Sequence, residues 1–378
     1  MDPEMAKADS NQIILIEKGK ITAIGSGLTI PAGAVVVDLS RFTVLPGLFD
    51  AHTHLCMTVQ KQRDNGNYYY TTLNDPDSFR AIEGVANARA MLDAGFTTVR
   101  DVGNEGNYAC SSLRLAIQAG LALGPTIINA GRIIAPYGGQ FQLQQDKSGL
   151  GEPEYFYADT RDEMVKGIRQ NIHYGARVIK IVVDDQKYIY SADDIRFIIE
   201  EAGRAGMKVA AHCWTHPGAH NAALAGVASI EHGFDMTDDD LELAKKNNVV
   251  VVGTEYLALS IPGTHDRWID RLRRAYKIGV PLVYGTDAID AQEGQTRGTL
   301  AISGIEPWIE AGIPAPRLLK AMTIDAARLL GVDKDRGLLR VGMAADIIAT
   351  PENPLENANT LKRVSFVMRN GVVIRKAE

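Results

Sequence analysis

The sequence has few cysteines, no long apolar run and no excess of basic charge. Its three cysteines, Cys56, Cys110 and Cys213, are too few for a disulfide framework and favour a reducing compartment. No apolar run approaches the roughly 20 residues that a membrane-spanning helix needs, so we expect no membrane partner. A formal net charge of -6 argues against a broad electrostatic surface for nucleic acid.

The start of the chain also lacks the apolar segment of a secretion signal. Residues 1–12 are polar, which favours a cytoplasmic protein. The alternative is the mature form of an exported protein whose signal is not in this chain. At 378 residues the chain is long enough for one large α/β barrel with a smaller appendage.

What the sequence does contain is a long alternation of short apolar runs with helix-period stretches. Thr160, Ser191 and Thr237 each precede acidic residues of a first turn and mark helix starts. Eight of the apolar runs are expected to be strands, the number that a closed parallel barrel requires. These predicted strands are 47–52, 97–101, 126–129, 178–181, 209–212, 229–232, 249–253 and 282–287.

Both ends of the chain are predicted to form β-strands without intervening helices. Asn370-Gly371 near the end is the dipeptide that a type I′ hairpin turn favours. Neither end has enough apolar surface for a core of its own, so we expect the two ends to pair in one small domain. The predicted strands are 13–17, 21–24, 35–37 and 43–45 at the start, and 346–349, 364–368 and 372–374 at the end.

These patterns predict an α/β fold with three segments. A (β/α)8 TIM barrel at 47–336 would carry a small β-sandwich domain built from both chain termini, 1–46 and 337–378. Residues 135–159 are an exception to the alternation, because they form a long stretch rich in Gly and Gln without a periodic pattern. Such a stretch after the third strand is typical of a lid or a substrate-binding loop.

Ionisable side chains stand at the ends of five of the predicted barrel strands. The carboxyl ends of barrel strands form the face on which this fold carries its functional residues. His52 and His54 are two residues apart on the first strand, so both imidazoles point to the same side. Scattered residues would not be expected to meet at one face in this way by chance. The full set is His52, His54, Lys180, His212, His232 and Asp287.

Five stretches, in order along nearly the whole chain, carry a family likeness: 45–54, 95–103, 229–233, 285–287 and 342–346. With them the sequence closely resembles the amidohydrolase superfamily, especially imidazolonepropionase-like members and the Xaa-Pro and Xaa-Arg dipeptidases. The likeness is specific for the superfamily and much less specific for the substrate. It also implies self-assembly into a homo-oligomer.

The resemblance implies a pair of divalent metal ions, with zinc as the expected metal. His52, His54 and Asp287 would hold one ion, and His212 and His232 would hold the other. Lys180 would bridge both as an N-carboxylated lysine. Burial beside cations favours the neutral amine, which can add carbon dioxide to become a carbamate.

The chemistry implied by this resemblance is hydrolysis of an amide bond in a small peptide-like or N-acyl compound. A metal-bound hydroxide would attack, with Asp287 as general acid and base and His232 beside it in the catalytic set. The alternatives are a one-metal hydrolase or deaminase of a cyclic amide or amidine, and a hydrolase of esters or lactones. Deaminase relatives usually lack the bridging lysine, so Lys180 favours the first reading.

Three further residues are candidates for contact with the substrate. Dipeptidase relatives commonly place Gly-Gly-His after strand three, where this chain has Gln140. They tend to carry His-Ala-Tyr at the end of strand five, where this chain has Trp214, a hydrogen-bond donor only. Tyr188, in the loop after strand four, would supply an aromatic wall. The substitutions at Gln140 and Trp214 put dipeptidase activity in question without touching the metal set.

Overall fold

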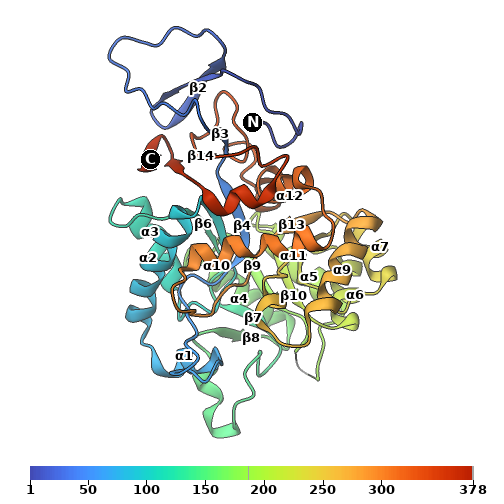
Figure 1. Cartoon of the computed structure of the whole chain (residues 1–378). Helices are drawn as coiled ribbons and strands as arrows, with labels where there is room; N and C mark the ends of the chain where they lie inside the picture. The colour runs from blue at the N-terminus through green and yellow to red at the C-terminus, as the bar shows by residue number, and fades with distance from the viewer. Residues whose placement is uncertain (186, 377–378) are drawn as a thin grey trace.

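The computed structural model describes residues 1–185 and 187–376. Within this part of the chain, parallel strands form a barrel surrounded by helices, which confirms the predicted fold class (Figure 1). Each of the eight predicted barrel strands is present, with ends that shift by a few residues. They are β4 (Leu48–Thr53), β5 (Phe96–Asp101), β6 (Thr126–Asn129), β9 (Ile179–Val182), β10 (Val209–Cys213), β11 (Ser229–His232), β12 (Val250–Gly253) and β13 (Leu282–Tyr284).

Backbone hydrogen bonds join two groups of strands into the barrel. The strands β4, β5 and β6 pair in parallel, as do β9 to β13 in order. Where the segment after β13 meets β4, the amide of Asp287 donates to the carbonyl of His52 at 2.9 Å. Where β6 meets the segment before β9, the amide of Arg177 donates to the carbonyl of Asn129 at 2.7 Å. The hydrogen bond between Asp287 and His52 therefore places Asp287 directly beside the His52-Thr53-His54 segment.

The helices start where the sequence indicates. Thr160, Ser191 and Thr237 all form capping boxes, in which the side chain accepts from the third residue's amide and that residue's carboxylate accepts in return. Among the described residues, no helix is both long and apolar enough to cross a bilayer. The helices are α1 (Tyr69–Asn74), α2 (Asp77–Asp93), α3 (Ala109–Gln118), α4 (Arg161–His173), α5 (Ala192–Gly203), α6 (His216–Ala225), α7 (Asp238–Lys246), α8 (Leu257–Ser260), α9 (His265–Ile278), α10 (Arg297–Ser303), α11 (Ile305–Glu310), α12 (Ala315–Ala321) and α13 (Ile324–Leu330).

The two chain ends pair in one antiparallel sheet, as the sequence predicts. Its order is β16 (Val372–Arg375), β15 (Phe366–Arg369), β14 (Ile347–Thr350) and β3 (Thr43–Pro46), with the 3-10 helix η2 (Ala358–Arg363) before β15. The hairpin of β1 (Ile13–Glu17) and β2 (Lys20–Gly25) packs on this sheet through a shared apolar cluster. Asn370 and Gly371 have φ of 47° and 75°, as a type I′ turn needs.

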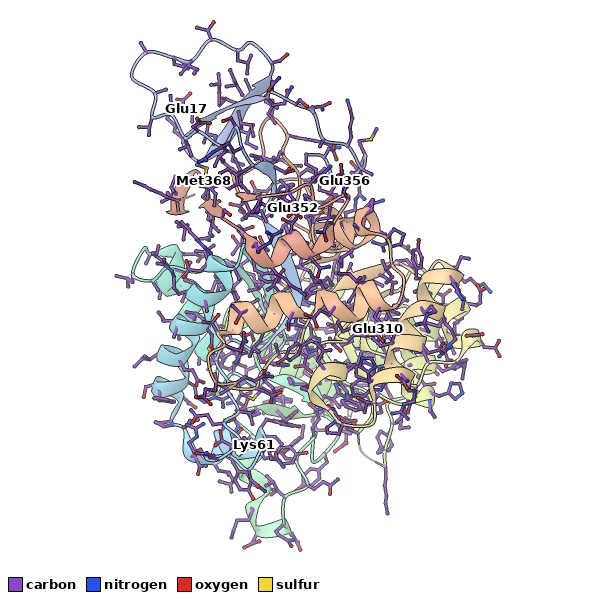
Figure 2. The ribbon with its side chains drawn as sticks, viewed as in Figure 1. Glu17, Lys61, Glu310, Glu352, Glu356 and Met368 are labelled. Atoms are coloured by element: carbon purple, nitrogen blue, oxygen red, sulfur yellow. The ribbon has the colours of Figure 1, made fainter. Side chains whose placement is uncertain are left out.

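The small domain lies at the opposite end of the barrel from the predicted site. β3 ends at Pro46 and β4 begins at Leu48, so the sheet adjoins the amino-terminal end of β4, whereas His52 is near its carboxyl end. Figure 2 shows Glu17 and Met368 at one end of the molecule and Lys61, in the loop after β4, at the other. The sheet can therefore stabilise the barrel without contacting the ionisable cluster.

One prediction about the connecting segments is wrong, and a second segment has more regular structure than its composition indicates. Residues 35–37 form no strand, and Val35 is 92% exposed. Their β-branched side chains favour an extended backbone, but a strand also needs a hydrogen-bonded neighbour, and none pairs here. Residues 135–159 are not uniformly irregular. They contain the 3-10 helix η1 (Gln145–Gly151) and a strand, β8 (Tyr155–Tyr157), whose aromatic run pairs in parallel with β7 (Ile133–Ala135).

Candidate active site

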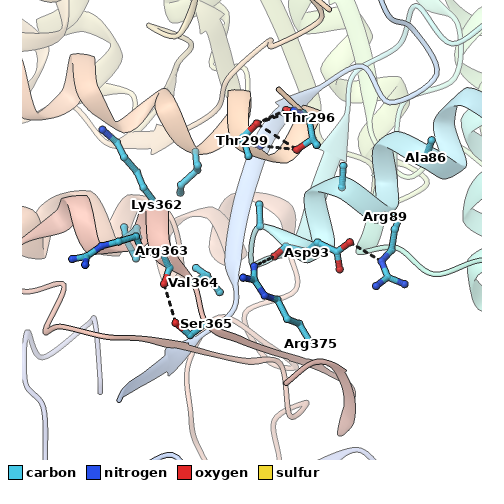
Figure 3. Close-up of a pocket in the computed structure, with 14 residues that line it drawn as sticks. Ala86, Arg89, Asp93, Thr296, Thr299, Lys362, Arg363, Val364, Ser365 and Arg375 are labelled. Atoms are coloured by element: carbon cyan, nitrogen blue, oxygen red, sulfur yellow. Dashed lines mark hydrogen bonds and ion pairs between the residues drawn. The ribbon is translucent and has the colours of Figure 1, made fainter. Parts of the chain in front are cut away.

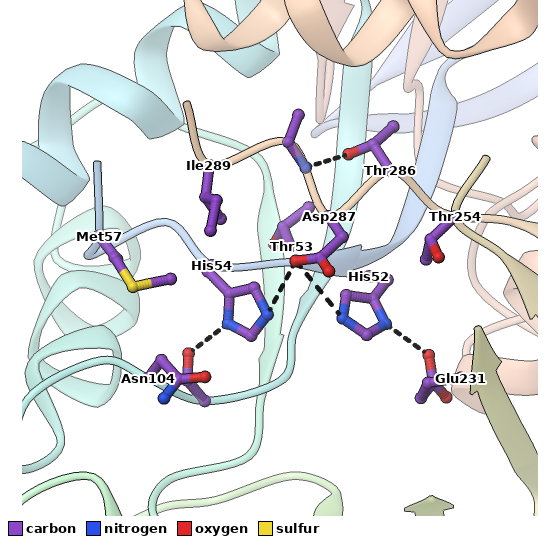
Figure 4. Close-up of polar contacts among 12 residues, drawn as sticks. His52, Thr53, His54, Met57, Asn104, Glu231, Thr254, Thr286, Asp287 and Ile289 are labelled. Atoms are coloured by element: carbon purple, nitrogen blue, oxygen red, sulfur yellow. Dashed lines mark hydrogen bonds and ion pairs between the residues drawn. The ribbon is translucent and has the colours of Figure 1, made fainter. Parts of the chain in front are cut away.

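Four histidines and one aspartate meet at the carboxyl end of the barrel. Figure 4 shows three of these residues, with His52 and His54 pointing toward Asp287. Asp287 Oδ1 lies 3.2 Å from His54 Nε2 and 3.8 Å from His52 Nε2. The ring of His232 is centred 4.7 Å from that of His52 and 4.8 Å from that of His212. The structure thus brings together the imidazoles that the sequence predicts, although they come from three different strands, β4, β10 and β11.

Lys180 faces the same cluster from β9. Its side chain is buried, and its charge interacts with those of His52, Asp287 and Glu231. Burial lowers the pKa of Lys180 to about 8, with the neighbouring Arg100 acting in the same direction. The amine can therefore lose its proton far more readily than a surface lysine, which is the form that ligation or carbon dioxide addition requires.

Unusual backbone conformations aim two of these residues inward. His232 and Asp287 have φ of 66° and 57°, a left-handed region that non-glycine residues seldom adopt. Gly285 precedes Asp287 where β13 meets β4, and a Cβ at that position would lie 2.8 Å from the Cβ of His52. Only glycine allows this approach, so the Gly285-Thr286-Asp287 sequence places the carboxylate against His52 and His54.

Three of the histidines have one ring nitrogen held by an acceptor or hydroxyl outside the cluster. His52 Nδ1 lies 2.8 Å from Glu231 Oε2, and His54 Nδ1 lies 2.6 Å from the carbonyl of Gly103. His232 Nδ1 lies 2.8 Å from Thr254 Oγ1. A histidine that binds a metal usually donates its other N–H in this way, which fixes both tautomer and ring orientation. The arrangement leaves the Nε2 atoms of His52 and His54 free to bind an ion.

His52 and Asp287 have the protonation states of metal ligands. Burial, with help from Lys180, lowers the pKa of His52 to about 4, so its ring is neutral near pH 7. Burial would raise the pKa of Asp287, but His52, His54 and Lys180 outweigh it and lower the pKa overall. Ligating atoms of His52, His54 and Asp287 all lie within 4.8 Å of one another. Burial would lower the pKa of His54, but Asp287 outweighs it and raises that pKa overall. A neutral imidazole at His52, the His54 ring and an ionised carboxylate at this spacing fit a divalent ion, which would take the place of a proton on His54.

A buried ion pair behind His52 is a feature that sequence reasoning missed. Arg100 donates from Nη2 to both carboxylate oxygens of Glu231, at 2.7 and 2.8 Å, and from Nε to the carbonyl of Ala51 at 2.6 Å. Burial would raise the pKa of Glu231, but Arg100 and His52 hold it far below its usual range. Glu231 therefore stays ionised as the acceptor for His52, and Arg100 keeps it in place.

Glu231→Gln is expected to weaken binding of the ion at His52 by about 10–100-fold, the usual cost of losing such a partner. The amide would turn its NH2 group toward either Arg100 or the His52 N–H, and both are donors. Glu201→Gln is a matched control, because Glu201 is a buried acid paired with Arg169 and Arg204 on the outer helices. Chelator competition would measure both affinities; equal affinities in the two variants would contradict this role.

Asp50 is a second buried acid that the sequence did not single out. It accepts hydrogen bonds from the amides of His52 and Thr286, at 3.0 and 3.1 Å, and from Thr286 Oγ1 at 2.6 Å. Burial raises its pKa to about 7. Because these bonds join β4 to the turn after β13, Asp50 fixes the two segments that carry His52 and Asp287. The only sequence signal was its position two residues before His52.

The three predicted substrate contacts differ in their surroundings. Trp214 is half-buried, with its ring centred 6.3 Å from that of His212 and 5.9 Å from that of His232. Gln140 is fully engaged, since Nε2 donates to Asp185 Oδ2 at 2.8 Å and Oε1 accepts from the Tyr155 hydroxyl at 3.0 Å. Tyr188 is 57% exposed. Trp214 therefore has the position best suited to meet a ligand beside the imidazoles.

Comparison with known proteins decides the family. The model of the amidohydrolase family matches residues 43–374. The chain belongs to the amidohydrolase family. It is therefore a hydrolase that acts on carbon–nitrogen bonds, and the cluster at the barrel mouth occupies the end of the fold where such enzymes carry their chemistry.

Relatives of this amidohydrolase differ widely in their named substrates. Over 416 aligned residues the chain is 28% identical to ochratoxinase of Aspergillus niger, covering 97% of this chain and 83% of that protein. It is 24% identical over 376 residues to imidazolonepropionase of Fusobacterium nucleatum, covering 90% and 84%. The crystal structure of a Xaa-Pro dipeptidase with bound methionine in the active site matches with a TM-score of 0.88 and 28% identity, covering 99% and 97%.

A groove of ≈ 580 Å³ elsewhere on this amidohydrolase is unrelated to the cluster. It lies outside the barrel between α2, α10, η2 and β16 (Figure 3). Its charged groups are already paired, as Arg89 is with Asp93 and Lys362 with Glu306. None of the six predicted ligands lines it, so the chemistry belongs to the barrel mouth and not to this groove.

Proposed function

We propose that this chain is a binuclear metal-dependent amidohydrolase that cleaves the amide bond of a peptide-like or N-acyl compound. The observation that carries the proposal is the convergence of His52, His54 and Asp287 on one point, with His232 and His212 adjacent. Lys180 is buried within the same group. One ion needs only the first three residues, so the additional imidazoles and amine favour a second.

The residues present divide naturally between two ions. His52, His54 and Asp287 would hold one, and His212 and His232 the other. Lys180, as an N-carboxylated side chain, would offer one oxygen to each. Two divalent ions, with zinc the expected metal, would supply hydroxide at neutral pH and polarise the scissile carbonyl.

Asp287 would carry the proton through the reaction. Its lowered pKa keeps it ionised, so it can accept the proton of the attacking water. The same carboxylic acid would then donate that proton to the leaving nitrogen. His232 Nδ1 lies 4.0 Å from Asp287 Oδ2 and is held by Thr254, so it limits where the carboxylate can move.

The names of the relatives support an amide substrate with an apolar part. An ochratoxinase and a Xaa-Pro dipeptidase are among them, and each name specifies a substrate of that protein alone. In this chain Trp214 offers an aromatic surface next to His212 and His232. The relative named imidazolonepropionase favours the alternative, a hydrolase of a cyclic amide. Hydrolysis of esters or lactones is the remaining alternative.

The test is a substrate panel with zinc-loaded protein and Asp287→Asn as the blank. Dipeptides, N-acyl amino acids, lactams and carboxyl esters would be compared under identical conditions. Turnover of linear amides, above the blank, supports the proposal. Turnover confined to lactams, in protein that binds a single ion, would replace it with the one-metal alternative, and turnover confined to esters would replace it with the esterase.

A further inference from the structure

Asp185 lies between Gln140 and His212 at the edge of the site. Its Oδ2 accepts from Gln140 Nε2 at 2.8 Å and lies 2.7 Å from His212 Nε2. The carboxylate is off the direction of the ring N–H, so the contact with His212 is a close approach of Oδ2 to Nε2 without an aligned hydrogen bond. Asp185 is 27% exposed in its side chain and has φ of 83°, outside the backbone regions that residues other than glycine usually adopt.

The contact at His212 differs from those of the other three histidines. His52, His54 and His232 each have Nδ1 held from outside the cluster, by Glu231, Gly103 and Thr254. His212 instead has Nε2 beside a carboxylate, which favours the tautomer with the proton on Nε2. That tautomer leaves Nδ1 with the lone pair that a metal needs.

The neighbouring Asp184 has a different task. It is fully buried and accepts from the amides of Trp214 and Thr215, at 3.0 and 2.8 Å, and from Thr215 Oγ1 at 2.8 Å. These bonds fix the turn between β10 and α6. Its Oδ1 is 3.8 Å from His212 Nε2, well beyond the distance of Asp185. The two adjacent acids are therefore not equivalent, and only Asp185 is placed to act on the imidazole.

Gln140 is anchored so that it can hold Asp185. Besides the Tyr155 bond to its side chain, its backbone carbonyl accepts from the Tyr69 hydroxyl at 2.5 Å. A Cβ at Gly139 would lie 2.8 Å from the Tyr155 ring, so the turn before Gln140 sits tightly on that ring. Both the nitrogen and the oxygen of the Gln140 side-chain amide are consequently hydrogen-bonded within the protein.

We infer that Asp185 is a positioning residue for His212, and that Gln140 acts by orienting Asp185 and not by contacting the substrate. This inference rests on the proposed two-metal function, because His212 is a ligand only of the second ion. The electrostatic attraction would hold the proton of His212 on Nε2 and limit rotation of the ring. The loop that carries Gln140 is thereby connected to the metal site through Asp185.

The experiment compares Asp185→Ala and Gln140→Ala with the wild type by chelator competition and steady-state kinetics. We expect Asp185→Ala to weaken one of two ions by about 10–100-fold, as loss of such a partner usually does. Activity should return at saturating zinc, with KM unchanged. Gln140→Ala should shift the same ion in the same direction by less. Asp146→Ala, an exposed acid in the same loop region, is the control and should change neither affinity.

Several outcomes would overturn the inference. A raised KM at unchanged metal affinity would make Asp185 or Gln140 a substrate contact. Loss of one ion that saturating zinc cannot restore would make Asp185 a ligand itself. Identical affinities in wild type and Asp185→Ala, with two ions in each, would remove the positioning role while leaving the proposed function intact. A wild type that binds fewer than two ions would instead refute the proposed function.

Discussion

Asp287→Asn is expected to retain its metal ions while losing about 10²–10⁴-fold in kcat, the usual contribution of a positioned acid–base group. The amide keeps the shape and one oxygen of the carboxylate beside His54, but it cannot accept the proton of the attacking water. Kinetics on the fastest substrate of the panel, together with metal analysis of the same samples, would measure both quantities.

Asp290→Asn is the matched control for that variant. Asp290 follows in the same loop, is partly buried and has a raised pKa, mainly because of burial and also because of the charge of Asp287. It makes no contact with the histidines that the structure places around Asp287, so its conversion to the amide should change kcat little. Full activity of Asp287→Asn at full metal loading would contradict the acid–base role.

Lys180→Ala is expected to lose one ion and about a thousandfold in activity, because charge stabilisation by a bound metal is worth several kcal/mol. Removing the side chain deletes the proposed bridge and leaves a space at the centre of the barrel. A short carboxylic acid such as propionate should enter that space and restore part of the activity. Metal content and turnover, with and without propionate, are the measurements.

Lys208→Ala tests whether the effect is specific to this amine. Lys208 is a more exposed lysine than Lys180, and partial burial of its amine also lowers its pKa, but it donates to the carbonyls of Arg328 and Leu329 away from the histidines. We expect it to alter stability without altering metal content. Carbon-13-labelled bicarbonate should give a carbamate signal in the wild type and in Lys208→Ala. A signal that persists in Lys180→Ala would place the modification elsewhere.

The barrel and its six ionisable residues were predictable because local sequence encodes them. Short apolar runs mark the strands, and a ligand at a strand end needs no knowledge of its neighbour to be noticed. The turn Asn370-Gly371 and the capping boxes are equally local. The prediction that failed did not depend on local sequence alone. Residues 35–37 have the composition of a strand but no partner, and strand pairing is a property of the folded chain.

The supporting residues were missed for the same reason. Glu231 contacts Arg100 across 131 positions and His52 across 179, so no spacing rule could connect them. Gln140 was predicted to contact substrate because it stands where dipeptidase relatives carry the histidine of Gly-Gly-His; the sequence did not indicate that its amide is bonded to Asp185 and Tyr155. Sequence position indicates that a side chain is near the site; only the hydrogen bonds indicate which partner it serves.

The most direct test of a shared two-ion centre is an anomalous difference map, at the zinc edge, from a crystal of the zinc-loaded wild type. The account predicts two peaks about 3.5–4 Å apart. One would contact His52, His54 and Asp287, the other would contact His212 and His232, and density extending from Lys180 would reach both. A single peak, or a pair that Lys180 does not touch, would contradict it.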